Sequence, residues 1–275
     1  MGAEVQRSLH LPEPVPYRPA ANLSLEAFAA LVQGPASFTA LVTLNVLTSN
    51  LTEQTSMLQR LLALGVPPGS LVLELGNELY IPMPNYQQVF PTVSAYAALC
   101  NTWVPALRQA LPPGVRIVLD GSVAHNSTSD PRRATWNQGL WRALDLPAAR
   151  PDALVLHAYA SWPGTPSACP RFGWGSPALQ QREAAAVQPS RVLAVLQHDA
   201  QATLANAIVP AAEIPLFVDE YAVLGDCGAL RLTWLHGLAT AALALTFHQH
   251  PLVTLTSYWV RERERDRERE RERWG

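Results

Sequence analysis

From residue 38 onward, short apolar runs rich in β-branched residues alternate with longer stretches of helical periodicity. This alternation is typical of consecutive βα units, in which the strands pair in parallel and the helices cover the sheet. The apolar runs are nearly continuous, which indicates strands that are buried on both faces. A chain of 275 residues suits one large domain of this kind. The sequence therefore predicts a single α/β domain built around a parallel sheet.

Six runs have the composition of buried strands. They are 38–46, 70–75, 115–120, 152–159, 214–219 and 252–259, with helices expected at 53–64, 93–111, 134–143, 181–207 and 231–247. A closed (β/α)8 barrel has about eight strands, so two are missing. The Pro-rich segment 1–37 contains one short expected helix, 25–32, and no convincing strand.

The chain is therefore expected to hold strands three to eight of a TIM-type barrel, truncated at its N-terminal side. Segment 1–37 is predicted to be irregular, 38–260 to form the partial (β/α) barrel, and 261–275 to be a low-complexity Arg/Glu tail. No activity is expected of this tail, because charge runs of this kind are usually solvated.

Composition narrows the possible partners. The formal net charge of -2 argues against a nucleic-acid partner, since phosphate binding needs a basic face. No segment reaches the ~18 apolar residues of a membrane span, and the first residues lack a signal-peptide core. Sequons at Asn22, Asn50 and Asn126 are weak evidence that a longer form is secreted, and the localisation stays open. Cys169 and Cys227 are candidates for a disulfide in an oxidising compartment.

Two strands are followed by a carboxylate. Asn77 and Glu78 follow one strand in LVLELGNELY, and Glu220 follows another in IPLFVDEYAV. In a barrel, both acids would project from the carboxyl ends of the strands, where barrel enzymes carry their active sites. Glycoside hydrolysis needs two carboxyl groups that flank the scissile bond. The pair Glu78 and Glu220 therefore predicts a glycosidase site.

These motifs resemble clan A of the glycoside hydrolases, which carry the acid/base after barrel strand four and the nucleophile on strand seven. The resemblance covers roughly residues 38–260, and TLNVLTSN followed by LELGNELY looks most like the heparanase-like and arabinofuranosidase-like families. It implies a retaining mechanism, with Glu78 as acid/base and Glu220 as nucleophile. The two carboxyl groups would then lie ~5 to 5.5 Å apart.

The resemblance also implies substrate-binding residues. Asn77 would bind the sugar 2-hydroxyl beside the scissile bond, and His157 and Tyr159 would orient Glu220 or bind the sugar. Tyr221, next to the nucleophile, would contact the substrate, and Trp259 would provide an aromatic platform under the sugar ring. The implied partner is a polysaccharide or glycoside, and no cofactor or metal is implied.

Other interpretations stay open. The main alternative is a catalytically inactive carbohydrate-binding barrel fragment, a pseudoenzyme, which the missing strands favour. A third is an unrelated doubly wound α/β protein in which Glu78 and Glu220 merely cap loops, although the Gly-rich phosphate-binding motifs are absent.

Three further polar residues are expected to have structural roles. Asp219 is expected to face away from Glu220 by strand alternation. His248 and His250 are more simply placed at a helix C-terminus than at a metal.

Overall fold

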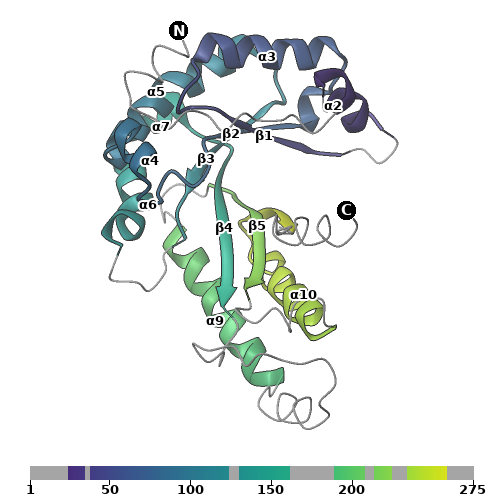
Figure 1. Ribbon diagram of the computed structural model, residues 1–275, viewed down its shortest axis with the longest axis vertical. Helices are drawn as coiled ribbons and strands as arrows, with labels where there is room; N and C mark the ends of the chain where they lie inside the picture. The colour runs from purple at the N-terminus through teal and green to yellow at the C-terminus, as the bar shows by residue number, and fades with distance from the viewer. Residues whose placement is uncertain are drawn as a thin grey trace, which may run out of the picture. The chain divides into compact units, whose positions relative to one another are not determined.

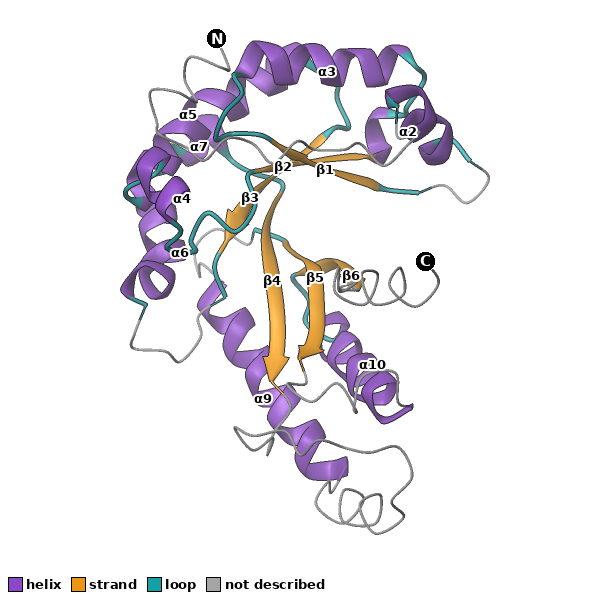
Figure 2. Cartoon of the chain, in the orientation of Figure 1, coloured by secondary structure: helices purple, strands orange, loops and turns teal. Residues whose placement is uncertain are grey.

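The computed structural model describes residues 24–34, 38–123, 130–161, 189–207, 214–224 and 234–258, and the structural statements below concern these ranges. Six strands form one sheet in chain order, and helices follow the strands (Figures 1 and 2). The strands are β1 (Ala40–Leu44), β2 (Leu71–Leu75), β3 (Arg116–Gly121), β4 (Ala153–Ser161), β5 (Leu216–Leu224) and β6 (Val253–Tyr258).

The fold is α/β, an incomplete (β/α)8 barrel with six parallel strands, as the sequence predicts. The register is parallel from β1 through β4, with Leu44 opposite Leu75, Leu75 opposite Leu119 and Leu119 opposite Leu154. Parallel register brings the carboxyl ends of these strands to one edge of the sheet. Side chains that follow β2 and β3 therefore come together at that edge.

The helices agree closely with the predicted ranges. They are α2 (Leu25–Val32), α3 (Leu51–Ala63), α4 (Pro84–Val89), α5 (Val93–Ala110), α6 (Pro131–Ala143), α7 (Leu146–Ala149), α9 (Pro189–Ala207) and α10 (Trp234–His248), with a 3-10 turn η1 (Pro68–Ser70). The sequence did not predict α4, α7 and η1, which are too short to show a clear helical period. No helix in the described ranges is long and apolar enough to cross a membrane.

Side-chain caps fix where several helices begin. In each case a short polar side chain accepts a hydrogen bond from the backbone N–H three residues later, which satisfies a donor that has no partner inside the helix. The capping residues are Ser24, Asn50, Thr92 and Asp130. Because the helix starts are fixed, the loops between strand ends and helices are fixed in length as well.

The chain forms two compact units. The first comprises Met1–Leu156 and Thr203–Phe217, and the second comprises His157–Ala202 and Val218–Gly275. In the first unit α3 runs along one side of β1 and β2 (Figure 1), and α5 contacts α3, α6 and α7. In the second unit α10 contacts β6.

The core of the first unit is centred on β2, all of whose residues are buried. Leu71, Leu73 and Leu75 are fully shielded from solvent, and burial of one such side chain contributes about 1.5 to 3 kcal/mol. A strand buried on both faces leaves its carboxyl end as the place where polar side chains emerge. That end leads directly into Gly76, Asn77 and Glu78.

Candidate active site

The turn after β2 has an unusual backbone conformation, with positive φ at two residues. Gly76 has φ +93°, and a Cβ at this position would lie 2.4 Å from Leu79 Cδ1. Within the described ranges, Glu78 is the only residue other than glycine with a positive φ, 51°. Such a backbone costs about 1 to 3 kcal/mol and persists where the surroundings impose it. The turn that carries Glu78 is therefore held in place by its neighbours.

Three hydrogen bonds hold this turn. The Leu79 N–H donates to Asp120 Oδ2 at 2.6 Å, and the Leu79 carbonyl accepts from Arg132 Nη2 at 2.9 Å. The Tyr96 hydroxyl donates to the Leu75 carbonyl at 2.6 Å. These partners come from β3, α6 and α5, so three neighbouring elements fix the backbone at Leu75 and at Leu79, before and after Glu78.

The Glu78 side chain is half-buried and accepts a hydrogen bond from the Tyr80 hydroxyl at Oε1, at 3.2 Å. Tyr80 is 1% exposed. Burial, with the negative charges of Asp120 and Glu78, raises the pKa of Tyr80 well above its ordinary range. Tyr80 therefore stays a protonated donor toward Glu78 at physiological pH.

Asn77 lines a cavity of about 210 Å³ at the carboxyl ends of β1 and β2. The cavity combines apolar side chains with a few polar groups, as small-ligand sites do. Its lining residues are Thr43, Leu44, Asn45, Val46, Leu47, Gly76, Asn77, Leu79 and Tyr86. Burial, followed by the charges of Glu78 and Asp120, raises the pKa of Tyr86. Tyr86 was not predicted as a site residue, because it lies in α4, which is too short to show a helical period.

In the second unit, Glu220 has partners from the neighbouring strand. The Tyr159 hydroxyl donates a hydrogen bond to Glu220 Oε2. His157 Nδ1 lies 3.6 Å from the same oxygen, and the Glu220 side chain is 27% exposed. His157 and Tyr159 are two residues apart on β4, so their side chains share one face. The structure therefore brings together three of the predicted site residues: His157, Tyr159 and Glu220.

Asp219 also lies near His157. Alternation along the strand predicts that it faces away from Glu220, and its Oδ1 lies 3.2 Å from His157 Nε2, the nitrogen that does not approach Glu220. The two nitrogens of one imidazole point in different directions, so the buried His157 reaches both acids. In addition, Glu220 lies inside β5, whereas the sequence placed it after a strand ending at 219. The apolar residues after Tyr221 continue the strand.

The remaining predicted residues differ in their surroundings. Tyr221 is buried, and its ring packs edge-on against Phe247 of α10 at 5.9 Å between centroids. Trp259 lies outside the described residues, as do the loop residues Trp162, Trp174, Cys169 and Cys227. The roles of Tyr221 and Trp259 in substrate binding stay predictions.

The two histidines at the end of α10 have local partners. His248 Nε2 lies 2.8 Å from the Thr256 hydroxyl, and His250 Nδ1 accepts from the Leu252 N–H at 3.3 Å. These contacts join the end of α10 to β6 and to the residue before it. They account for both side chains as part of a helix-to-strand connection.

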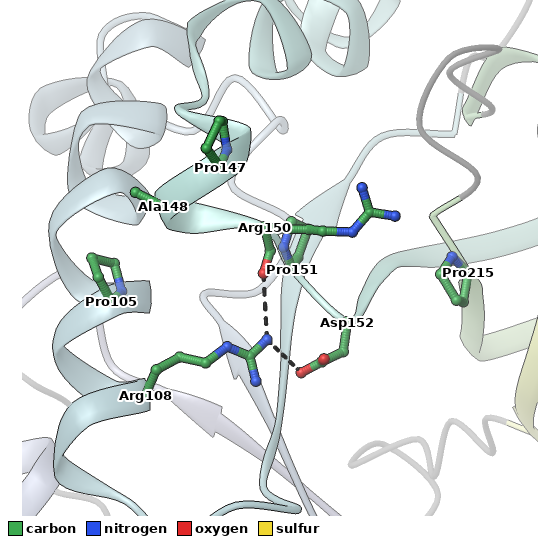
Figure 3. Close-up of a pocket in the computed structure, with 8 residues that line it drawn as sticks. All are labelled: Pro105, Arg108, Pro147, Ala148, Arg150, Pro151, Asp152 and Pro215. Atoms are coloured by element: carbon green, nitrogen blue, oxygen red, sulfur yellow. Dashed lines mark hydrogen bonds and ion pairs between the residues drawn. The ribbon is translucent and has the colours of Figure 1, made fainter.

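A larger cavity, of about 550 Å³, lies at the opposite edge of the sheet, before β4. Figure 3 shows that Arg108 reaches from α5 to the Arg150 carbonyl and to the Asp152 carboxylate, at 3.3 and 2.9 Å. Asp152 also accepts from the Ile117 N–H at 2.6 Å. Residues at the amino ends of barrel strands serve stability rather than catalysis. This cavity is therefore not the candidate active site.

Comparison with known proteins identifies the fold. No protein-family model matches the chain, and no curated protein matches its sequence. An α-L-arabinofuranosidase from Thermotoga maritima, in its arabinose complex, matches with a TM-score of 0.50 and 14% identity over 86% of this chain and 46% of that chain. A family 51 α-L-arabinofuranosidase from Bifidobacterium longum gives 0.52 and 18% over 86% and 51%. The fold is that of the arabinofuranosidase-like glycoside hydrolases.

This chain spans about half the length of those two enzymes. Of the two kinds of clan A enzyme expected from the sequence, the likeness supports the arabinofuranosidase-like one and not the heparanase-like one. Glu78 follows β2, and Glu220 lies on β5.

Proposed function

We propose that this protein is a retaining glycoside hydrolase in which Glu78 is the acid/base and Glu220 is the nucleophile. The observation that carries the proposal is the turn at Glu78. A non-glycine residue with φ 51°, after the carboxyl end of β2, is held by hydrogen bonds to its neighbours, and β2 would be the fourth barrel strand if β1 is the third. Strain of this kind is concentrated at functional sites.

The surroundings of Glu220 support its role as the nucleophile. A nucleophilic carboxylate must present one oxygen to the anomeric carbon. Hydrogen bonds from neighbouring side chains to the carboxylate fix the direction in which that oxygen points. Tyr159 and His157 both approach Glu220 Oε2. Asp219, on the other side of the His157 ring, would hold the imidazole in one orientation.

The mechanism would proceed in two steps. In the first, a Glu220 oxygen attacks the anomeric carbon, the glycosidic C–O bond breaks, and the Glu78 proton passes to the leaving oxygen. In the second, Glu78 takes a proton from water as that water attacks the anomeric carbon, and the bond to Glu220 breaks. The two carboxyl groups must approach to ~5 to 5.5 Å for this chemistry, and that separation stays a prediction.

α-L-Arabinofuranosides are the substrates to test first, because the similar solved enzymes act on them by name. Asn77 would bind the sugar 2-hydroxyl from its cavity at the ends of β1 and β2. Tyr221 and Trp259 would complete the binding site. The protein needs no cofactor in this scheme.

The test is hydrolysis of 4-nitrophenyl α-L-arabinofuranoside, with the anomeric configuration of the first-formed sugar followed by ¹H NMR. We expect turnover with retention, and a covalent adduct at Glu220 with a 2-fluoro arabinosyl probe, detected by mass spectrometry after proteolysis. Inversion, or labelling elsewhere, would contradict the proposed roles. Glu78→Gln should slow hydrolysis of phenyl arabinosides by about 10²-fold or more.

The alternative is a catalytically inactive carbohydrate-binding protein. It predicts binding of arabinosides in calorimetry without turnover, and equal binding by Glu78→Gln and the unchanged chain. The proposed division into 1–37, a catalytic 38–260 and a tail 261–275 can be tested with the same assay, because a chain lacking 261–275 should keep full activity.

A further inference from the structure

We infer that Asp120 and Arg132 are positioning residues that clamp the Leu79 peptide groups and thereby aim Glu78; this inference rests on the proposed function. Neither residue was singled out by the sequence motifs. Asp120 comes from the carboxyl end of β3, and Arg132 comes from the first turn of α6. Their partner, Leu79, directly follows the acid/base candidate.

The clamp grips one residue at both of its hydrogen-bonding groups. Asp120 Oδ2 accepts from the Leu79 N–H at 2.6 Å, and Arg132 Nη2 donates to the Leu79 carbonyl at 2.9 Å. The Leu79 N–H belongs to the Glu78–Leu79 peptide and the Leu79 carbonyl to the next one, so the two peptides that flank Leu79 have little freedom to rotate. Both bonds involve a charged side chain, which makes them shorter and stronger than neutral ones.

Arg132 ties this peptide to the loop before α5. Its Nη2 also donates to the Phe90 carbonyl at 2.8 Å, and its Nη1 donates to the Pro91 carbonyl at 3.0 Å. A guanidinium presents five N–H donors in a fixed planar fork, so it can serve three carbonyl oxygens at defined positions. Its Cζ lies 4.9 Å from the centre of the Trp136 ring, so a flat apolar surface supports the guanidinium from one side.

Asp120 is anchored equally well. Its carboxylate is buried, at 1% residue exposure, and its backbone N–H donates to the Tyr96 hydroxyl at 3.0 Å. The Trp136 Nε1–H donates to the Asp120 carbonyl at 3.0 Å. The rings of Tyr96 and Trp136 stack at 5.5 Å between centroids. Asp120 and Arg132 thus share one aromatic support, and both act on Leu79.

This arrangement explains how a glutamate keeps φ 51°. If the Leu79 peptide were free, the backbone would relax toward negative φ, and rotation about φ would redirect the Glu78 side chain. The Tyr80 hydroxyl donates a hydrogen bond to the Glu78 carboxylate. Loss of the clamp should therefore weaken proton transfer by Glu78 and leave nucleophilic attack less affected.

The experiment compares Arg132→Met and Arg132→Lys with the matched control Arg142→Met, an exposed arginine in the last turn of the same helix. Each protein is assayed on phenyl and on 4-nitrophenyl α-L-arabinofuranoside, because only the phenyl leaving group depends strongly on an acid. Circular dichroism and thermal unfolding check the fold. Glu78→Gln is run as the reference for complete loss of the acid.

We expect Arg132→Met to lower kcat/KM, which reports the first step alone, at least tenfold more on the phenyl substrate than on the 4-nitrophenyl substrate. The difference between the two substrates in Arg132→Lys should lie between that of Arg132→Met and that of the unchanged chain. Arg142→Met should match the unchanged chain. A loss that is equal on both substrates would overturn the inference. If Arg132→Met does not fold, Arg132→Lys decides, because it must still show at least a threefold difference between the substrates.

Failure of the inference and failure of the proposed function give different results. If Glu78→Gln discriminates between the leaving groups and the Arg132 variants do not, only the clamp is contradicted. If the unchanged chain hydrolyses neither substrate, or if Glu78→Gln treats both alike, the proposed role of Glu78 fails first. Asp120→Asn is a further check: its amide oxygen can still accept from Leu79, so its effect should be smaller than that of Arg132→Met.

Discussion

The two candidate catalytic carboxylates are positioned by different means. Glu78 is held mainly through its backbone, by a glycine-dependent turn and by hydrogen bonds to the adjacent Leu79. Glu220 lies in a regular strand and is held through its side chain, by Tyr159 and His157. The difference agrees with their proposed roles. An acid/base donates a proton in the first step and removes one from water in the second, whereas a nucleophile must direct one oxygen at the anomeric carbon.

The contrast implies two kinds of sensitivity. Substitutions near Glu220 should change chemistry without changing stability, because the strand does not depend on the polar contacts. Substitutions in the turn before Glu78 should change stability and activity together, because the backbone itself is under strain. The following variants test this difference, and their expected effects decrease in order.

The largest effect is expected for Glu220→Gln. It removes the attacking oxygen's charge and should lower kcat on 4-nitrophenyl α-L-arabinofuranoside by about 10⁴-fold. Thermal unfolding should be nearly unchanged, since the side chain is 27% exposed and lies within β5. The control is Glu53→Gln, an exposed cap-proximal acid on α3, which should retain full activity. Equal activity in the two variants would remove Glu220 from the mechanism.

Tyr159→Phe should give the next largest loss. It keeps the ring and removes the hydroxyl that donates to Glu220 Oε2, so we expect kcat to fall by about 10 to 100-fold with little change in thermal stability. Tyr221→Phe is the comparison, because its ring packs against Phe247 and should stay in place. A role in substrate binding predicts that Tyr221→Phe raises KM rather than lowering kcat. Full activity of Tyr159→Phe would show that Glu220 needs no side-chain support.

Much of this arrangement could be predicted from the sequence. Continuous apolar runs and cap residues set the six strands and the longer helices to within a few residues, because burial and capping are local signals. The motif residues after β2 and on β5 were found from their strand positions. Helices of a single turn or two, such as α4 and α7, carry too few residues for a periodic signal.

The supports of the site were harder to predict. Asp120 ends a predicted strand, but only the parallel register of β2 and β3 brings it to the Leu79 N–H. The proximity of Asp219 to His157 was not predictable from alternation along β5, because it depends on the neighbouring strand. Arg132 carries no motif, and its three carbonyl partners lie 41 to 53 residues away in the chain. Such contacts depend on tertiary packing.

Gly76→Ala tests whether the turn before Glu78, unlike the strand that carries Glu220, affects the stability of the protein. Its φ of +93° disfavours a side chain, and a Cβ would meet Leu79 Cδ1 at 2.4 Å. We expect a loss of about 1 to 3 kcal/mol in the free energy of unfolding by urea, with reduced activity. The matched control is Gly69→Ala, since a Cβ there meets nothing within 4 Å. Equal stabilities would mean that the turn before Glu78 is not strained.

The smallest effect on activity is expected at the opposite edge of the sheet. Arg108→Met removes the ion pair with Asp152, whose partners are 39% and 33% exposed at their side chains. Exposed pairs contribute about 0 to 1 kcal/mol, so the urea midpoint should shift slightly and kcat should stay within about twofold. Both Arg108 and Arg132 bind backbone carbonyls, which makes them a matched pair at opposite strand ends. If Arg108→Met lowered kcat as much as Arg132→Met, the loss in Arg132→Met would come from reduced overall stability. The proposal that Arg132 acts through the backbone next to Glu78 would then be contradicted.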